Sequence, residues 1–309
     1  MRLSWRVRDR GRGIACGEDA HAGVGTQAPT PKLTRRGTLV PATSARDGHD
    51  LALRRRMRRA ILEVESDRAV AGGRRQAVVL VNGDERVPGV LLVPIAPRPA
   101  PAALLLHGYS SDKERMASSV GRVLIGYGIA SLAIDLPLHG ARTSGAAGIP
   151  ASELRNPIVL ARRWRAALAE CRDALRALGQ LPEVDAGRIA IIGYSMGSFI
   201  ALMLGADDPD VRALVLGAGG DLPANLPFGP VIRTLVDPVR AARKFAGRPL
   251  LLVHGRHDRT ILPEQATRLF DAAGEPKRLL WYNGGHWLPD NAIRDAVRWL
   301  APILGVPAV

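Results

Sequence analysis

The stretch from Arg188 to Ser198, with the sequence RIAIIGYSMGS, limits the possible folds of this chain more than any other. Its first half is apolar and rich in isoleucine, which predicts a buried strand. Its second half is a Gly-x-Ser-x-Gly motif, and the residues that follow, FIALML, predict a helix. A serine between such a strand and helix sits on a sharp, strained turn that exposes its hydroxyl. We therefore predict that Ser195 is a nucleophile; an incidental serine in an ordinary turn is the alternative.

The rest of the chain alternates short apolar runs with helical patterns, which predicts a mostly parallel sheet with helices on both faces. The predicted strands cover residues 61–65, 76–81, 87–94, 102–106, 130–134, 188–193, 211–216, 250–253 and 278–282. The predicted helices after the first sheet strands cover residues 114–127, 158–178, 263–273 and 290–304. The turn signal Asn82-Gly83-Asp84 predicts an antiparallel hairpin near the amino terminus of this domain.

Two further segments bear on the architecture. The helix over residues 158–178 places apolar side chains on one face, which predicts a core helix. These side chains are Trp164, Leu168, Cys171, Leu175 and Leu178. The segment 219–248 is too short for an independent cap domain, so we expect a small helical flap over the site and no large cap.

The amino-terminal segment differs in composition from the rest of the chain. Residues 1–56 show no sustained period of a helix or a strand, so we expect a disordered basic arm followed by one domain over residues 57–309. The net charge is +14, and residues 1–75 contribute +9 of it, with 17 basic against 8 acidic residues. This basic segment lacks interleaved aromatic residues and matches no nucleic-acid-binding module, so no nucleic-acid partner is expected.

Cysteine content and hydropathy bear on location. The two cysteines, Cys16 and Cys171, do not make a disulfide framework, which favours a reducing compartment. No apolar run reaches the length of a transmembrane helix, and the amino terminus lacks the apolar region of a secretory signal. We therefore expect a cytoplasmic protein without a transmembrane segment.

A serine hydroxyl needs a base within hydrogen-bond reach, and the base needs an orienting group. His286 follows a predicted strand directly, in a glycine-containing turn at the carboxyl edge of the sheet, and is the predicted general base. Asp258 follows the strand 250–253 and is the predicted orienting carboxylate. Asp221, which follows the strand before that one, is the alternative carboxylate.

An oxyanion must also be stabilised, and backbone N–H groups that are already aimed at it do so efficiently. The predicted donors are the N–H of Met196, at the start of the helix after the serine, and the N–H of Tyr109, in the loop after the strand 102–106. His107 in the same loop is expected to be structural. Arg142 and Arg233 lie in the two segments that build the pocket; we expect solvated surface arginines, with recognition of a substrate carboxylate as the alternative.

Residues from about 60 to 305 resemble α/β-hydrolase-fold serine hydrolases, in particular dienelactone-hydrolase-like esterases and the hydrolase domains related to prolyl oligopeptidases. The stretches that carry the resemblance are HGY at 107–109 with KE at 113–114, DLPLHG at 135–140, VDAGR at 184–188, DP at 237–238 with RP at 248–249, HGRHD at 254–258 and GGH at 284–286. The dienelactone hydrolases use a cysteine nucleophile where this chain has Ser195, so serine chemistry is expected.

The combined prediction is a serine hydrolase that cleaves carboxylic esters of small to medium size through an acyl-enzyme. Neither a metal nor an organic cofactor is expected, because no Cys/His cluster is apparent. An acyltransferase or a peptidase with the same catalytic residues is the first alternative, and an inactive binding protein with this fold is the second. The sequence leaves the natural substrate and the oligomeric state open.

Overall fold

The computed structural model describes residues 60–96, 99–143, 156–224 and 229–307. All of them belong to one unit of the chain, residues 49–309. The predicted arm, residues 1–56, lies outside the described residues, so the boundary between arm and domain stays a prediction.

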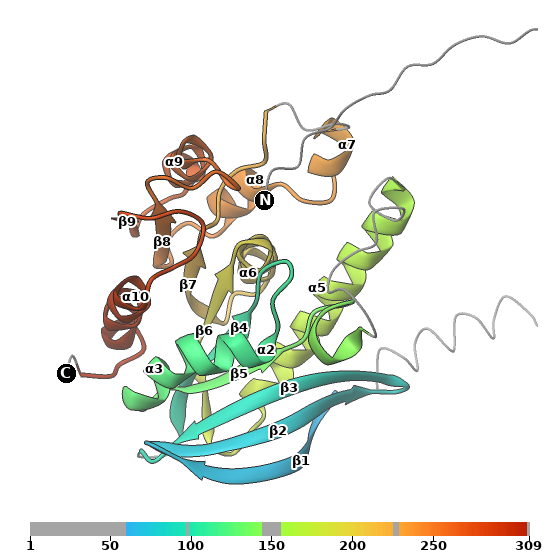
Figure 1. Cartoon of the computed structure of the whole chain (residues 1–309), viewed down its shortest axis with the longest axis vertical. Coiled ribbons are helices and arrows are strands. Elements are labelled where there is room, and N and C mark those ends of the chain that lie inside the picture. Colours follow the sequence, from blue (N-terminus) through green and yellow to red (C-terminus); the bar gives the residue numbers. More distant parts are fainter. Residues whose placement is uncertain (1–59, 97–98, 144–155, 225–228, 308–309) are drawn as a thin grey trace, which may run out of the picture. The chain divides into compact units, whose positions relative to one another are not determined.

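A nine-stranded sheet forms the centre of the described part, with the strand order β1-β2-β3-β5-β4-β6-β7-β8-β9 (Figure 1). The strands are β1 Ile61–Val70, β2 Gly73–Asn82, β3 Glu85–Pro94, β4 Ala100–Leu106, β5 Ala130–Ile134, β6 Val184–Tyr194, β7 Val211–Gly217, β8 Leu250–Gly255 and β9 Lys277–Tyr282. The three amino-terminal strands pair antiparallel, and β3 also pairs antiparallel with β5. All pairs from β5 across to β9 are parallel, which confirms the predicted fold class.

Helices cover both faces of the sheet. One layer contains α2 Lys113–Met116, the π-helix η1 Ala117–Gly121, α3 Arg122–Gly126 and α10 Asp290–Ile303. The other layer contains α5 Pro157–Gly179, α6 Met196–Asp207, α8 Pro238–Lys244 and α9 Pro263–Ala272. Two short helices, η2 Gly140–Arg142 and α7 Gly229–Arg233, lie in connecting segments. The predicted helix 114–127 is therefore a helical segment that contains a π-helical turn.

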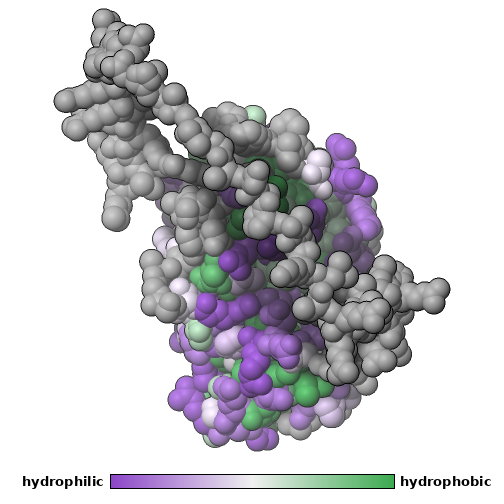
Figure 2. Space-filling view, turned by 90° about the vertical axis from the view of Figure 1, so that its right-hand side faces the viewer, coloured by the Kyte–Doolittle hydropathy of each residue, from purple (hydrophilic) through white to green (hydrophobic). Residues whose placement is uncertain are grey.

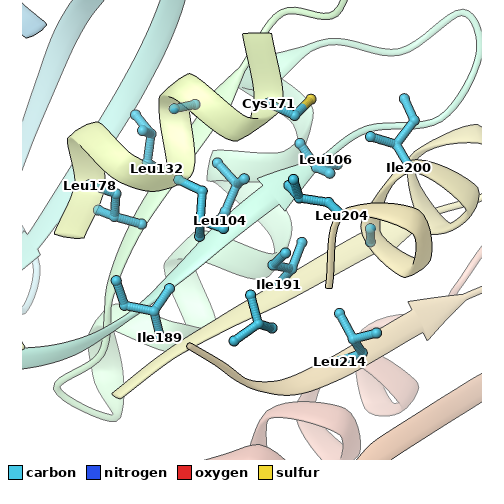
Figure 3. Close-up of a cluster of buried hydrophobic side chains, with 14 of the residues drawn as sticks. Leu104, Leu106, Leu132, Cys171, Leu178, Ile189, Ile191, Ile200, Leu204 and Leu214 are labelled. Atoms are coloured by element: carbon cyan, nitrogen blue, oxygen red, sulfur yellow. The ribbon is translucent and has the colours of Figure 1, made fainter. Parts of the chain in front are cut away.

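Strand alternation divides the core into two clusters, one on each face. Leu104 and Leu106 of β4 point to the face covered by α5 and α6, where Cys171 and Leu178 of α5 meet them (Figure 3). Leu105, between them in the sequence, points to the opposite face. Cys171 and Leu178 are fully buried, so the apolar stripe predicted for this helix is part of the core.

The predicted flap, 219–248, has a different role in part of its length. Helix α8 buries Ala241 and Ala242, and Phe245 follows it with only 1% exposed surface. These side chains belong to the cluster that also contains residues of α6 and α9. The apolar spacing at 241, 242 and 245 gives α8 a core-facing side, which is why it packs as a core helix and not as a flap over the site.

The outer strand β1 carries the exposed edge of the sheet. Ile61 and Val64 are 52% and 54% exposed, and the strand also carries the charged residues Glu63, Glu65, Asp67 and Arg68. Charged residues on an edge strand discourage pairing with another chain. Figure 2 shows hydrophilic residues spread over the described part of one face of the molecule, with hydrophobic residues between them. No helix in the described part of the chain has the length and apolar composition needed to cross a membrane.

Candidate active site

Ser195 lies on a strained turn between β6 and α6, with φ 50° and ψ −114°. The flanking glycines allow the close approach on which this turn depends: a Cβ atom at Gly193 would lie 2.3 Å from the Gly197 carbonyl oxygen. A Cβ atom at Gly197 would lie 2.1 Å from the Leu106 carbonyl oxygen. The side chain of Ser198 fixes the turn, since its hydroxyl donates to the Ser195 carbonyl at 2.6 Å. The predicted strand, turn and helix are therefore present, and the reason for both glycines is steric.

The structure brings Ser195, His286 and Asp258 together. His286 Nε2 lies 2.9 Å from Ser195 Oγ, and His286 Nδ1 lies 2.7 Å from Asp258 Oδ2. Asp258 is 2% exposed, and its other carboxylate oxygen accepts the N–H groups of Thr260 and Ile261 at 2.8 and 3.1 Å. Two backbone donors on one oxygen leave the second oxygen directed at the imidazole.

A second imidazole lies near the same carboxylate. His254 Nε2 is 3.6 Å from Asp258 Oδ2 and 3.0 Å from the carbonyl oxygen of Ile261. Burial lowers the pKa of His254, which is 1% exposed. A neutral His254 adds no full positive charge beside Asp258, so the carboxylate remains the counter-charge for His286.

The alternative carboxylate, Asp221, makes different contacts. It is 6% exposed and accepts two hydrogen bonds from Arg233, at 3.0 and 3.1 Å, and a longer one from Arg268 at 3.4 Å. Although burial opposes its ionisation, the hydrogen bonds from Arg233 and from the Leu222 N–H hold the pKa of Asp221 below its usual value. Of the two candidate acids, the structure joins Asp258 to His286 and joins Asp221 to arginines.

Arg142 and Arg233 are paired with protein carboxylates. Arg142 donates to both oxygens of Glu170, at 2.5 and 3.0 Å, and Arg233 forms the pair with Asp221 described above. The expectation of a solvated surface arginine was wrong for Arg142, whose side chain is 17% exposed, whereas the Arg233 side chain is 35% exposed and also forms an ion pair. Glu170 lies far from Arg142 in the sequence, and Asp221 lies in the loop that precedes the helix of Arg233. A pattern of charges along the sequence does not reveal either pair.

The loop after β4 lies against the nucleophile turn, as predicted. A Cβ atom at Gly108 would lie 3.1 Å from the Ser195 Cβ atom. His107 is fully buried and bridges two loops: its Nε2 accepts the Leu136 N–H at 3.0 Å, so its Nδ1 carries the proton and donates to the Gly108 carbonyl at 2.8 Å. Burial lowers the pKa of His107 to about 4, which keeps this tautomer neutral. The structural role expected for His107 fits these contacts.

These contacts also orient one peptide group. In a trans peptide the carbonyl and the N–H point in opposite directions, so a carbonyl held by His107 directs the N–H of Tyr109 away from His107. Met196 opens α6, and the first N–H groups of a helix have no acceptor within that helix. The two predicted N–H donors thus belong to the loop and the helix that adjoin Ser195.

Sequence reasoning missed a buried ion pair that supports this loop. Asp135 is fully buried and accepts the N–H and the ammonium group of Lys113 at 2.9 and 2.7 Å. Its second oxygen also accepts the Ala141 N–H at 2.8 Å. Lys113 and Asp135 both stood in motifs noted in the sequence, but their pairing depends on the parallel contact of β4 with β5, which brings the two loops side by side.

Two tyrosines that the sequence analysis did not single out hold the main chain of His286. The hydroxyl of Tyr194 donates to the His286 carbonyl at 2.6 Å, and the hydroxyl of Tyr282 lies 3.4 Å from the same oxygen and 2.9 Å from the Gly285 carbonyl. Burial raises the pKa of both phenols, so both remain hydrogen-bond donors at neutral pH. A tyrosine at the carboxyl end of a central strand, next to the serine, was the available signal.

Known proteins are similar to this chain in sequence and in fold. An uncharacterized protein of Mycobacterium tuberculosis (strain ATCC 25618 / H37Rv) is 28% identical over 247 residues, which cover 76% of this chain and 82% of that protein. Esterase YjfP of Escherichia coli (strain K12) is 27% identical over 203 residues, covering 58% of this chain and 77% of that protein.

Solved structures and a family model add to these relatives. The structure of a novel cold-adapted esterase from an Arctic intertidal metagenomic library superposes with a TM-score of 0.60 and 24% identity, covering 76% of this chain and 96% of that one. At this identity the likeness shows the fold alone. The model of the alpha/beta hydrolase family matches residues 103–304, a range that contains Ser195, Asp258 and His286. This chain therefore belongs to the alpha/beta hydrolase family.

Proposed function

We propose that this chain hydrolyses carboxylic esters of small to medium size through an acyl-enzyme on Ser195. The observation that carries the proposal is the continuous hydrogen-bond path from Asp258 through His286 to Ser195, with distances of 2.7 and 2.9 Å. Membership in the alpha/beta hydrolase family and the esterase named among its relatives support the same class of reaction.

Each of the three residues has a distinct role in the proposed first step. Ser195 Oγ attacks the ester carbonyl carbon while His286 Nε2 accepts the hydroxyl proton. Asp258 holds the proton on His286 Nδ1, which leaves Nε2 free to act as the base, and it stabilises the imidazolium that forms. The serine is presented for this attack by its backbone conformation, which directs its hydroxyl out of the turn.

The negative charge of the tetrahedral intermediate falls on the former carbonyl oxygen. In the proposed mechanism the N–H groups of Met196 and Tyr109 donate to this oxyanion. The Met196 N–H lies at the positive end of α6, which adds to the stabilisation. The Tyr109 N–H is oriented by the contact between His107 and the Gly108 carbonyl.

The second half of the cycle releases the two products. His286 gives its proton to the departing alcohol oxygen as the bond between that oxygen and the acyl carbon breaks. A water molecule then attacks the acyl-enzyme, His286 accepts one of its protons, and the carboxylic acid leaves as Ser195 Oγ regains a proton. No step in this cycle needs another reactant. The cytoplasmic location and the absence of a nucleic-acid partner remain predictions from the sequence.

Burst kinetics with p-nitrophenyl acetate test the proposal. We expect the wild type to release nitrophenol in a burst that equals the enzyme concentration, because acylation precedes a slower deacylation. Ser195→Ala should show no burst, whereas the control Ser118→Ala, at an exposed serine of η1, should keep it. An equal, weak and burst-free signal from the wild type and Ser195→Ala would contradict the proposal and favour a binding protein.

A further inference from the structure

A cavity of about 260 Å³ lies beneath the His286 loop, on the face of the sheet opposite α6. Helix α10 borders it on one side, and the helical segment of α2 and η1 borders it on the other. Its lining is mostly apolar and includes Ile192, Val215 and Val253 from three neighbouring strands and Ala292, Ala296 and Val297 from α10. These six side chains are buried, so the cavity reaches into the core.

The cavity is separate from the proposed catalytic residues. Its lining contains neither Ser195 nor His286 nor Asp258. Tyr194 connects the two sites: it lines the cavity, and its hydroxyl donates to the His286 carbonyl at 2.6 Å. Gly108 of the loop beside Ser195 also lies against this ring, since a Cβ atom there would be 2.9 Å from Tyr194 Cδ1. Tyr194 therefore contacts both the cavity and the two loops of the proposed active site.

The mouth of the cavity carries an exposed aromatic ring with charged neighbours. Trp287 is 60% exposed, and its ring stacks on Tyr194 with centroids 5.9 Å apart and an interplanar angle of 23°. The guanidinium of Arg115 lies 5.1 Å from the centre of the Trp287 ring. Arg115 and the exposed Asp290 both border the cavity, so opposite charges flank its mouth. An apolar pocket with a few polar groups at its rim is typical of sites for small molecules.

Two features of the chain lie where the cavity is bordered. Helix α10 presents two alanines, Ala292 and Ala296, where larger apolar side chains would fill the gap. On the opposite side the helical segment contains the π-helical turn η1, and both Ser118 and Ser119 donate their hydroxyl groups to the Arg115 carbonyl, at 3.2 and 2.6 Å. Single π-helical turns occur frequently at functional sites. An unfilled apolar void lowers stability, and a ligand that fills it offsets this cost.

We propose that this cavity binds an uncharged, apolar small molecule, aromatic or branched aliphatic, independently of Ser195. An apolar cavity of about 150 Å³ accepts benzene, so a cavity of this volume accepts a molecule of about ten non-hydrogen atoms. The apolar lining selects against a ligand with a net charge, because burying an unpaired charge there is costly. Binding itself does not rest on the proposed esterase function. The consequence of binding does rest on it: a ligand that contacts Tyr194 and Trp287 shifts the main chain of His286 and thereby changes the rate of acylation.

A titration with 5-fluoroindole, an uncharged ring system of that size, tests binding by ¹⁹F NMR. We expect saturable binding to the wild type. Ala296→Leu places a larger side chain in the cavity and should weaken binding about tenfold or more. Arg294→Leu adds a leucine on the exposed side of the same helix and should bind like the wild type. Thermal denaturation checks that each variant folds, and Ala292→Leu replaces Ala296→Leu if the latter does not.

The same titration is repeated on Ser195→Ala and on enzyme treated with diethyl p-nitrophenyl phosphate. Unchanged binding by both supports a site independent of Ser195. Loss of binding after the phosphate treatment would mean that the probe occupies the substrate site, and this would overturn the proposal. Absence of saturable binding to the wild type, or equal binding by the filled variant, would overturn it as well. A failed burst experiment would remove the esterase function but leave the binding result standing, so the two failures are distinguishable.

Discussion

Two aspartates follow neighbouring strands of the sheet, and their carboxylates have different hydrogen-bond partners. Asp258 follows β8 and Asp221 follows β7, and both carboxylates are more than nine-tenths buried. Asp258 accepts hydrogen bonds from two backbone N–H groups and from the imidazole of His286. Asp221 accepts hydrogen bonds from the guanidinium groups of Arg233 and Arg268. Position and burial are thus nearly the same for the two residues, and the partner is different.

The partner decides what each carboxylate is able to do. A guanidinium stays charged at all accessible pH values, so Asp221 keeps its ion pair wherever its own carboxyl group is ionised. This pair ties the segment after β7 to α7 and α9. An imidazole can accept and give up a proton during a reaction, so Asp258 has a partner that is suited to proton transfer. The comparison predicts that Asp258 affects the reaction and Asp221 affects the stability of the fold.

The largest expected effect is on the Asp258 side of the comparison. Asp258→Asn should lower kcat for p-nitrophenyl acetate by a factor of about 10⁴, because the amide favours the wrong tautomer of His286. Steady-state kinetics measure this effect, and circular dichroism verifies that the variant folds. Asp221→Asn is the matched control, since it makes the same chemical change one strand away. A similar loss of kcat in both variants would break the comparison.

A second prediction extends the comparison to histidines. His107 lies at the same sheet edge as His286, but its partners are two backbone groups, and its pKa in the folded state is about 4, against 6.5 for an ordinary histidine. As the pH falls from 6.5 to 4, the unfolded chain takes up a proton at this residue before the folded chain does. Stability should therefore fall by about 3 kcal/mol over this interval because of His107 alone.

Urea denaturation of the wild type and of His107→Gln at pH 7 and pH 4 measures this contribution. A glutamine can donate to the Gly108 carbonyl and accept from the Leu136 N–H without titrating. The loss of stability between the two pH values should thus be smaller in the variant. An equal loss in both proteins would mean that His107 does not remain neutral in the fold.

The limits of the sequence analysis follow from the same comparison. The order of strands and the spacing of the motifs put Asp221 and Asp258 at one edge of the sheet, and both remained candidates. The structure decides between them because His286 contacts Asp258, whereas Arg233 of α7 and Arg268 of α9 contact Asp221. A strand pattern predicts where a side chain begins, whereas a partner that comes from a later helix depends on how that helix packs. The fold and the position of Ser195 were predictable because they follow from the strand pattern. The ion pairs were not predictable because they depend on how the later helices pack.

The third prediction concerns the Asp221 side. Asp221→Asn should lower the free energy of unfolding by about 2 kcal/mol, because the buried end of the pair with Arg233 loses its charge. Its effect on kcat should stay within about threefold. The pKa of Asp221 is below the ordinary value of 3.8, so its stabilisation is present above that pH and is lost as the pH falls through the folded pKa. Urea denaturation at pH 7 measures the change.

The control for this experiment is an ion pair on the surface. Asp295 and Arg298 lie on one exposed face of α10, with side chains that are 52% and 57% exposed. Asp295→Asn should change the free energy of unfolding by less than about 0.5 kcal/mol, because solvent screens such a pair. If Asp221→Asn is no more destabilising than Asp295→Asn, the ion pair does not tie the segment after β7 to the fold.

The smallest expected effect separates the two tyrosines that hold the main chain of His286. The Tyr194 hydroxyl is 2.6 Å from the His286 carbonyl, whereas the Tyr282 hydroxyl is 3.4 Å from it and bonds mainly to Gly285. Each hydrogen bond contributes about 1 kcal/mol, so Tyr194→Phe should lower kcat up to about fivefold. Tyr282→Phe should lower stability by a similar free energy with a smaller effect on kcat. Parallel measurements of kcat and of urea denaturation distinguish the two. If both variants lose stability and keep the wild-type kcat, the two tyrosines support the fold of the loop and do not affect the position of the His286 imidazole. Asp258 would then be the only one of these three residues whose contact with His286 affects the reaction.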